Sequence, residues 1–142
     1  MTQYQSDLKT ISSSEEVVFG MLSDLNNIGK LKDNNFFSEK LKILEYDKDN
    51  CLLEIDHIGK LGFTIIEREA YKTIKLKSFH LPIEMNAMIH LNQTAENSTE
   101  MRLTLAAELP SMIKIMLNKK LEKGINTLAD FFENFLNTQL NK

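Results

Sequence analysis

Three histidines, His57, His80 and His90, are the side chains best suited to metal binding or acid–base catalysis. A neutral imidazole binds zinc or moves a proton near neutral pH, but a site needs two or more such groups close together. The three histidines fall in three separate strand-like runs, and none stands in a His-x-His or His-Glu-x-x-His motif. Their spacing therefore predicts neither a metal site nor a catalytic histidine.

The remaining candidates for chemistry give the same result. Cys51 is the only cysteine and stands in the apolar run Cys51-Leu-Leu-Glu-Ile, which is typical of a buried strand with no base beside the thiol. The sequence contains no glycine-rich phosphate loop, no Gly-x-Ser-x-Gly motif and no carboxylate pair at catalytic spacing. We predict no catalytic residue, no bound metal and no cofactor.

One compact charged run, Glu67-Arg68-Glu69, stands at the end of a predicted strand. It has two interpretations. It is either a solvated turn with weak local ion pairs or a cap for the polar head group of a ligand.

Length and composition limit the classes of protein to consider. At 142 residues and 42% hydrophobic content, the chain is predicted to be one domain, spanning 1–142 and large enough to enclose a cavity. The formal net charge of -3 gives no basic excess, so nucleic acid is not an expected partner. No export signal and no apolar stretch of about 18 residues is present, which predicts a cytoplasmic protein.

The elements that must position any site begin with a strand over 3–11. A helix is predicted over 14–25, with Ser13 and Glu16 as its capping box, and a short helical piece follows it. Six strand-like runs lie between Leu41 and Leu109 and alternate apolar with polar residues.

A long helix of about 30 residues follows Pro110 and Ser111. Its apolar stripe is interrupted only by Gly124, which costs stability in a helix and so predicts a bend or a close approach. The stripe consists of Ile113, Met116, Leu117, Leu121, Ile125, Leu128, Phe132, Phe135 and Leu136.

These elements predict an α+β helix-grip architecture. A curved seven-stranded antiparallel sheet wraps around the long C-terminal helix, and one or two short helices follow the first strand. Because a helix seated in a curved sheet diverges from it near the middle, the space between them is either overfilled core or a cavity.

Three segments carry a resemblance to a known superfamily: Ser23-Asp24-Leu25-Asn26-Asn27, the central 59–75, and Leu103-Thr104-Leu105 leading to Pro110 and the long helix. Over nearly its whole length the chain resembles the START-like and polyketide cyclase-like superfamily, in particular small single-domain members from Bacteroidetes. The resemblance implies an internal pocket for a lipid, quinone, sterol-like or polyketide-like ligand. It implies no universal catalytic motif.

The predicted pocket lies between the inward-facing strand residues and the last helix. Phe36 and Phe37 are expected at its mouth, because two adjacent aromatic residues are rarely both exposed in a polar loop, and His57 is a candidate for orienting a ligand. The predicted wall is Ile55, Phe63, Ile65, Ile74, Leu76, Met85, Ala87, Ile89, Leu103, Leu105, Ala107, Leu117, Leu121, Ile125 and Leu128.

The start of the last helix is basic and amphipathic. Lys114, Lys119, Lys120 and Lys123 are opposed there only by Glu122, and several methionines and isoleucines accompany them. This pattern suits transient contact with an anionic membrane or an acidic protein, or else a solvated lysine face on a packed helix.

These observations favour a non-enzymatic protein that binds or carries a hydrophobic or amphipathic small molecule. Two alternatives remain open. One is a cyclase- or dehydrase-type enzyme acting on such a ligand, and the other is a protein-interaction module whose cavity is filled by its own side chains. A void below about 100 Å³ would favour the interaction module, because binding pockets commonly measure ~300 to 1,000 Å³.

Overall fold

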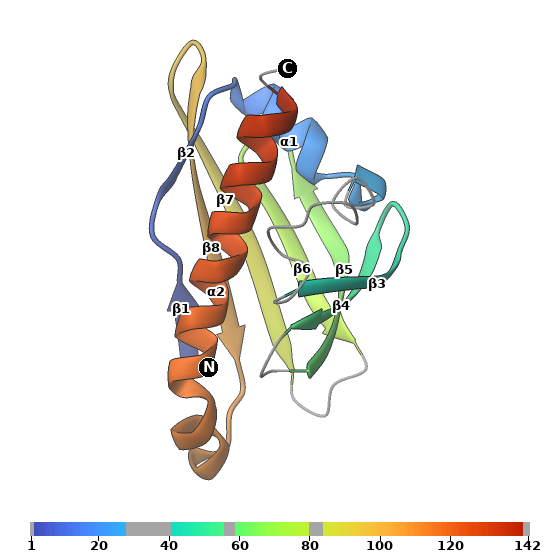
Figure 1. The fold of residues 1–142 in the computed structure, drawn as a ribbon, viewed down its shortest axis with the longest axis vertical. Coiled ribbons are helices and arrows are strands. Elements are labelled where there is room, and N and C mark those ends of the chain that lie inside the picture. The colour runs from blue at the N-terminus through green and yellow to red at the C-terminus, as the bar shows by residue number, and fades with distance from the viewer. Residues whose placement is uncertain (1, 28–40, 56–58, 80–83, 141–142) are drawn as a thin grey trace.

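The computed structural model describes residues 2–27, 41–55, 59–79 and 84–140 (Figure 1). The described elements are, in chain order, β1 (Thr2–Gln5), β2 (Lys9–Ile11), α1 (Glu15–Leu22), β3 (Leu41–Tyr46), β4 (Asn50–Ile55), β5 (Gly59–Glu69), β6 (Thr73–Phe79), β7 (Met85–Ala95), β8 (Ser98–Ala107) and α2 (Ser111–Leu140).

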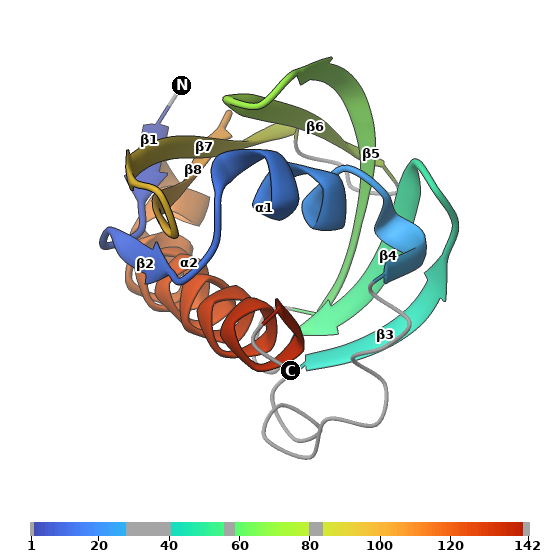
Figure 2. The ribbon, with the colours of Figure 1, turned by 90° about the horizontal axis from the view of Figure 1, so that it is seen from above.

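The strands form one antiparallel sheet in the order β1-β8-β7-β6-β5-β4-β3, and β2 also pairs with β8. Figure 2 shows the sheet curving into an arc, with α2 closing its open side between the N-terminal strands and β3, and α1 lying across one end. The α+β class, the antiparallel sheet wrapped around the long C-terminal helix and the helix-grip architecture are confirmed.

The first predicted strand is two strands, because Ser6 interrupts it. The Ser6 backbone N–H donates to the Leu103 carbonyl at 2.9 Å, and its hydroxyl accepts from the Leu103 N–H at 2.9 Å. Gln5 pairs with Thr104 and Lys9 with Met101. Lys9 is four residues from Gln5, whereas Met101 is three from Thr104, so the N-terminal segment holds one extra residue, as in a β-bulge. This extra residue changes which side chains face the core.

Helix α1 begins one residue later than the predicted capping box requires. Its N-cap is Ser14, whose hydroxyl accepts from the Val17 N–H. The Ser13 side chain is buried and donates to the Ser12 carbonyl, while the Ser13 carbonyl accepts from the Thr99 hydroxyl at 2.7 Å. The predicted Ser13–Glu16 box is therefore wrong, because the sheet already holds Ser13.

Helix α2 runs without a break over the predicted length, but its buried face differs from the predicted stripe. Met116, predicted to face the sheet, is 71% exposed, whereas Phe131, outside the stripe, is 1% exposed. The helix is thus uncovered at its start and buried on a wider face farther along.

The N-terminal segment runs alongside α2 and is bound to it by polar contacts. These contacts are Tyr4 Oη to Asn118 Oδ1 at 2.8 Å, Asp7 N to Asn126 Oδ1 at 2.9 Å, Lys9 Nζ to Asp130 Oδ1 at 2.5 Å, and Ser12 N to Asn137 Oδ1 at 2.8 Å.

Candidate functional site

A cavity of about 110 Å³ lies between the inner face of the sheet, the C-terminal end of α1 and the middle of α2. It is smaller than the ~300 to 1,000 Å³ of common ligand pockets and close to the ~150 Å³ of engineered apolar cavities that bind benzene. The cavity therefore has room for one ring or a short branched chain.

The lining crosses the middle of five strands. It consists of Cys51, Leu53, Leu61, Phe63, Leu76, Ala87, Met88, Ile89, Leu103, Thr104 and Leu105 from the sheet, Met21, Leu22, Asp24, Leu25 and Asn27 from α1 and the segment after it, and Leu121, Gly124, Ile125, Leu128, Phe132 and Phe135 from α2.

Much of the predicted wall reaches this lining, and part of it does not. The predicted residues that line the cavity are Phe63, Leu76, Ala87, Ile89, Leu103, Leu105, Leu121, Ile125 and Leu128. The described residues that lie elsewhere, and for which the prediction needs correction, are Ile65, Ile74, Met85, Ala107 and Leu117.

The corrections have a common cause. Ile65 pairs with the lining residue Leu76 and Ile74 with the lining residue Ile89, so both border the cavity without lining it. Met85 pairs with Ala107 at the other end of β7. These four residues are buried, while Leu117 is half-buried before the first lining residue of α2. Strand parity predicts the inward face, but it does not locate a void along that face.

Some lining residues fall outside the predicted wall, although the sequence carries a signal for most of them. Leu22, Leu25, Phe132 and Phe135 belong to apolar helical stripes, and Leu53 shares the strand parity of Ile55. The side chain of Ile55, together with Phe36, Phe37, His57 and His80, lies outside the described part of the molecule.

Polar groups gather at the α1 end of the cavity. Asp24 Oδ1 accepts from the Asn26 N–H at 2.9 Å, and Asn27 Nδ2 donates to the Met21 carbonyl at 2.9 Å. These contacts use one carboxylate oxygen and the amide nitrogen, so within the described residues Asp24 Oδ2 and Asn27 Oδ1 are left as acceptors. Both residues are among those that line the cavity, so its wall is apolar with two polar residues at the α1 end.

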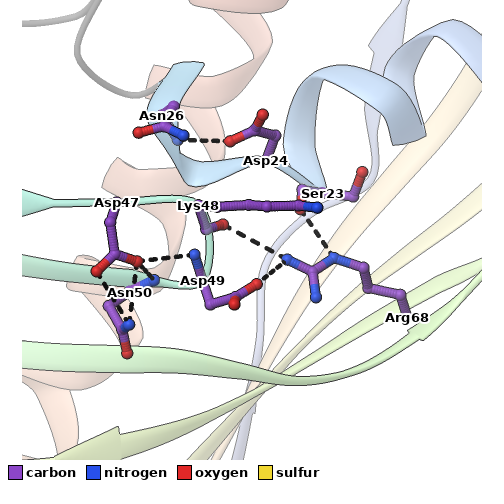
Figure 3. Close-up of polar contacts among 8 residues, drawn as sticks. All are labelled: Ser23, Asp24, Asn26, Asp47, Lys48, Asp49, Asn50 and Arg68. Atoms are coloured by element: carbon purple, nitrogen blue, oxygen red, sulfur yellow. Dashed lines mark hydrogen bonds and ion pairs between the residues drawn. The ribbon is translucent and has the colours of Figure 1, made fainter.

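Arg68 holds the segment that carries these acceptors (Figure 3). Its Nε donates to the Ser23 carbonyl at 2.9 Å, and its Nη2 forms an ion pair with Asp49 Oδ1 at 2.5 Å. The Leu25 N–H also donates to the Lys48 carbonyl at 2.9 Å, so the end of α1 is joined to the β3–β4 turn. Arg68 does not line the cavity, which favours the local ion-pair interpretation of the charged run over the ligand cap.

The other side chains considered for catalysis or metal binding do not come together in the described part of the structure. His90 is exposed on the outer face of the sheet, where its strand parity predicted it. Within the described ranges, no group of three or more His, Cys, Asp or Glu side chains is placed to hold a metal ion. The described helices include none that is both long and apolar enough to cross a membrane.

Cys51 is buried and lines the cavity, and burial raises the pKa of its thiol to about 11. We expect the native thiol to resist thiol–disulfide exchange with Ellman's reagent at pH 7.5, whereas a cysteine introduced at the exposed position Lys77 should react fully. Ellman's reagent measures both, with unfolded protein as the reference. Fast labelling of native Cys51 would contradict the closed packing around it.

The raised pKa also predicts how stability depends on pH. Because the unfolded thiol loses its proton near pH 9 and the folded one near 11, the contribution of this thiol to stability should be constant below about pH 9 and fall between 9 and 11. Urea unfolding at several pH values measures this fall. A Cys51→Ala variant should lack the part of the fall that the thiol causes.

The geometry can be compared with known proteins. No family model matches this sequence, and no curated protein matches it. Norcoclaurine synthase from Thalictrum flavum superposes with a TM-score of 0.72 at 13% identity, over 95% of this chain and 86% of that one.

Two further solved structures are similar. A START superfamily protein from Mycobacterium smegmatis gives a TM-score of 0.61 at 14% identity, over 96% and 98% of the two chains. The Zhui aromatase/cyclase from Streptomyces sp. R1128 gives 0.65 at 16% identity, over 97% and 92%. The chain therefore has the helix-grip fold of the START-like and polyketide cyclase-like proteins.

Proposed function

We propose that this protein binds or carries a small amphipathic molecule in the cavity without transforming it. The observation that carries the proposal is the lining, which is apolar throughout the sheet and α2 except for Thr104, with acceptors at the α1 end. Apolar walls with a few placed polar groups are typical of sites that bind small molecules.

The arrangement suggests how the ligand would lie. Its apolar part would occupy the space between Phe63, Leu103 and Ile125, and a hydroxyl or ammonium group would meet Asp24 and Asn27. A volume of about 110 Å³ holds a single ring or short chain, so a lipid, quinone, sterol-like or polyketide-like ligand would place only part of itself inside.

The alternatives differ in what they require of the lining. A cyclase-type enzyme needs an ionisable group beside the substrate, and among the described lining residues that group is Asp24, since the Cys51 thiol is protonated at neutral pH. The neighbours named norcoclaurine synthase and aromatase/cyclase give this alternative some weight. The void of about 110 Å³ lies at the ~100 Å³ boundary below which an interaction module with a filled cavity is favoured, so volume alone does not separate that alternative from ligand binding.

Matched small probes test the proposal. We expect p-cresol to bind about tenfold more tightly than toluene, because its hydroxyl can donate to an acceptor at the α1 end. Isothermal titration calorimetry or ligand-observed NMR measures both affinities. Asp24→Asn should reduce the preference while leaving toluene binding unchanged.

Native mass spectrometry and solvent extraction of the purified protein would then identify a co-purifying ligand. If neither p-cresol nor toluene binds and nothing co-purifies, the proposed function is wrong. Turnover of an extracted ligand, lost in Asp24→Asn, would instead establish the enzyme.

A further inference from the structure

Three large apolar side chains at the start of α2 point into solvent. Met112 is 79% exposed, Ile115 is 83% exposed and Met116 is 71% exposed. Their spacing of three and four residues places them on one face of the helix, so together they form a continuous apolar patch, here called the α2 patch. Single exposed apolar residues are common, but a group of three at such exposure points to an interaction surface.

The position of the α2 patch explains why the rest of the chain leaves it uncovered. The first polar contact between the N-terminal segment and the helix is Tyr4 with Asn118, after the patch has ended. Figure 1 shows the first turns of α2 extending past the ends of the neighbouring strands. A flat surface could therefore approach this end without first meeting the sheet.

Positive charge borders the α2 patch. Lys119 and Lys123 continue the same helical face, Lys120 lies at its rim, and the helix N-terminus adds a partial positive charge without an acidic residue in the first turn. None of Lys114, Lys119, Lys120 and Lys123 forms an ion pair with a residue in the described part of the chain.

The local charge is opposite in sign to that of the whole protein. Within 111–123, four lysines face one glutamate, a formal +3, in a chain whose total is -3, so the remaining residues carry -6. An anionic surface would attract this end of the molecule and repel the remainder, which fixes the orientation of approach.

We propose that the start of α2 docks on an anionic phospholipid bilayer, with Met112, Ile115 and Met116 inserted at the level of the acyl chains and the lysines among the head groups. An amphipathic helix with apolar residues on one face and lysines beside them is suited to this interface. A second copy of the chain fits less well, because a symmetric contact would bring like-charged lysines together. The inference goes beyond the proposed function, since docking and ligand binding use different residues.

Vesicle flotation tests the proposal by comparing two kinds of vesicle. One is made of phosphatidylcholine alone, and the other contains about one third phosphatidylglycerol, which is anionic. We expect binding to the anionic vesicles only, weakening as salt shortens the screening length below about 8 Å. Lys119→Glu with Lys123→Glu should weaken binding by about tenfold or more. Met112→Ser, Ile115→Ser and Met116→Ser combined should weaken it by a similar factor at unchanged charge.

Insertion has its own measurement, because the chain contains no tryptophan. Ile115→Trp should shift its emission to the blue on anionic vesicles, whereas Ile66→Trp, at a position 58% exposed on β5, should not. Ile66→Ser and Lys77→Glu are the matched flotation controls and should bind vesicles as the wild type does. Both residues are exposed and far from α2 in sequence.

Several outcomes would overturn the proposal. These are equal binding to neutral and anionic vesicles, no binding to either, binding lost equally in the control variants, or a concentration-dependent blue shift of Ile115→Trp without lipid, which would indicate a second copy. Uptake of p-cresol in solution should be unaffected by the α2 substitutions, so failure of docking can be told apart from failure of ligand binding.

Discussion

Replacing Ala87 by tryptophan is expected to abolish binding of p-cresol and toluene while the protein stays folded. Ala87 is half-buried in β7 and lines the cavity, so an indole there would occupy the space that a ligand needs. The cavity measures about 110 Å³, so an indole leaves too little of it for a ring. Calorimetric titration measures the loss of binding, and circular dichroism checks the fold.

Ala107→Trp is the matched control, because Ala107 is also an alanine of the sheet but is 0% exposed and lies outside the cavity. Overpacking a solid core typically costs about 1–3 kcal/mol or more, so this variant should be destabilised or unfolded. If instead Ala87→Trp unfolds and Ala107→Trp does not, the cavity has been assigned to the wrong part of the core.

The sheet could be predicted from the sequence because its burial pattern is local. Along β8, buried and half-buried residues alternate without exception from Ser98 to Ala107, and the sequence shows this as a period of two. The turn at Glu69-Ala70 separates two runs with the strand period, and the long helix after Pro110 coincides with a change of period. Together these features determine the helix-grip architecture.

Two predictions, the single first strand and the cap of α1, were wrong where side-chain hydroxyls bond to the backbone. Ser6 accepts from the backbone of β8, and Ser14 rather than Ser13 caps α1. Any of the three consecutive serines before α1 could cap a helix, so the choice depends on Thr99, which binds the Ser13 carbonyl from 86 residues away. A single sequence carries no signal for such a distant contact.

The sequence could predict a cavity between the sheet and the last helix, but not where along that interface it lies. A void exists where the side chains of two curved surfaces fail to meet, and this depends on differences in volume along the whole interface. The acceptors at Asp24 and Asn27 were also missed. Both residues belong to the segment after α1, which Arg68 joins to the β3–β4 turn, so their place in the lining depends on three separate parts of the chain.

Helix α2 buries a large side chain that its apolar stripe does not predict. Phe131 is 1% exposed and is the largest fully buried side chain in the described core, although it lies outside the predicted stripe. Truncation of a buried phenylalanine commonly costs about 3–5 kcal/mol, which is a large part of the total stability of a domain this size. We therefore expect Phe131→Ala to shift the urea midpoint strongly downward or to prevent folding.

Phe132 supplies the comparison from the adjacent position. It is half-buried and lines the cavity, and its ring lies 5.6 Å from that of Phe131. Phe132→Ala should cost less stability, because part of its surface is already exposed, and it should enlarge the cavity so that a bulkier phenol such as 4-tert-butylphenol binds more tightly than to the wild type. Phe131→Leu should recover most of the stability without changing the preference among phenols. Equal destabilisation by Phe131→Ala and Phe132→Ala, with unchanged probe selectivity in both, would mean that the two faces of α2 are not divided between core and cavity as the structure shows.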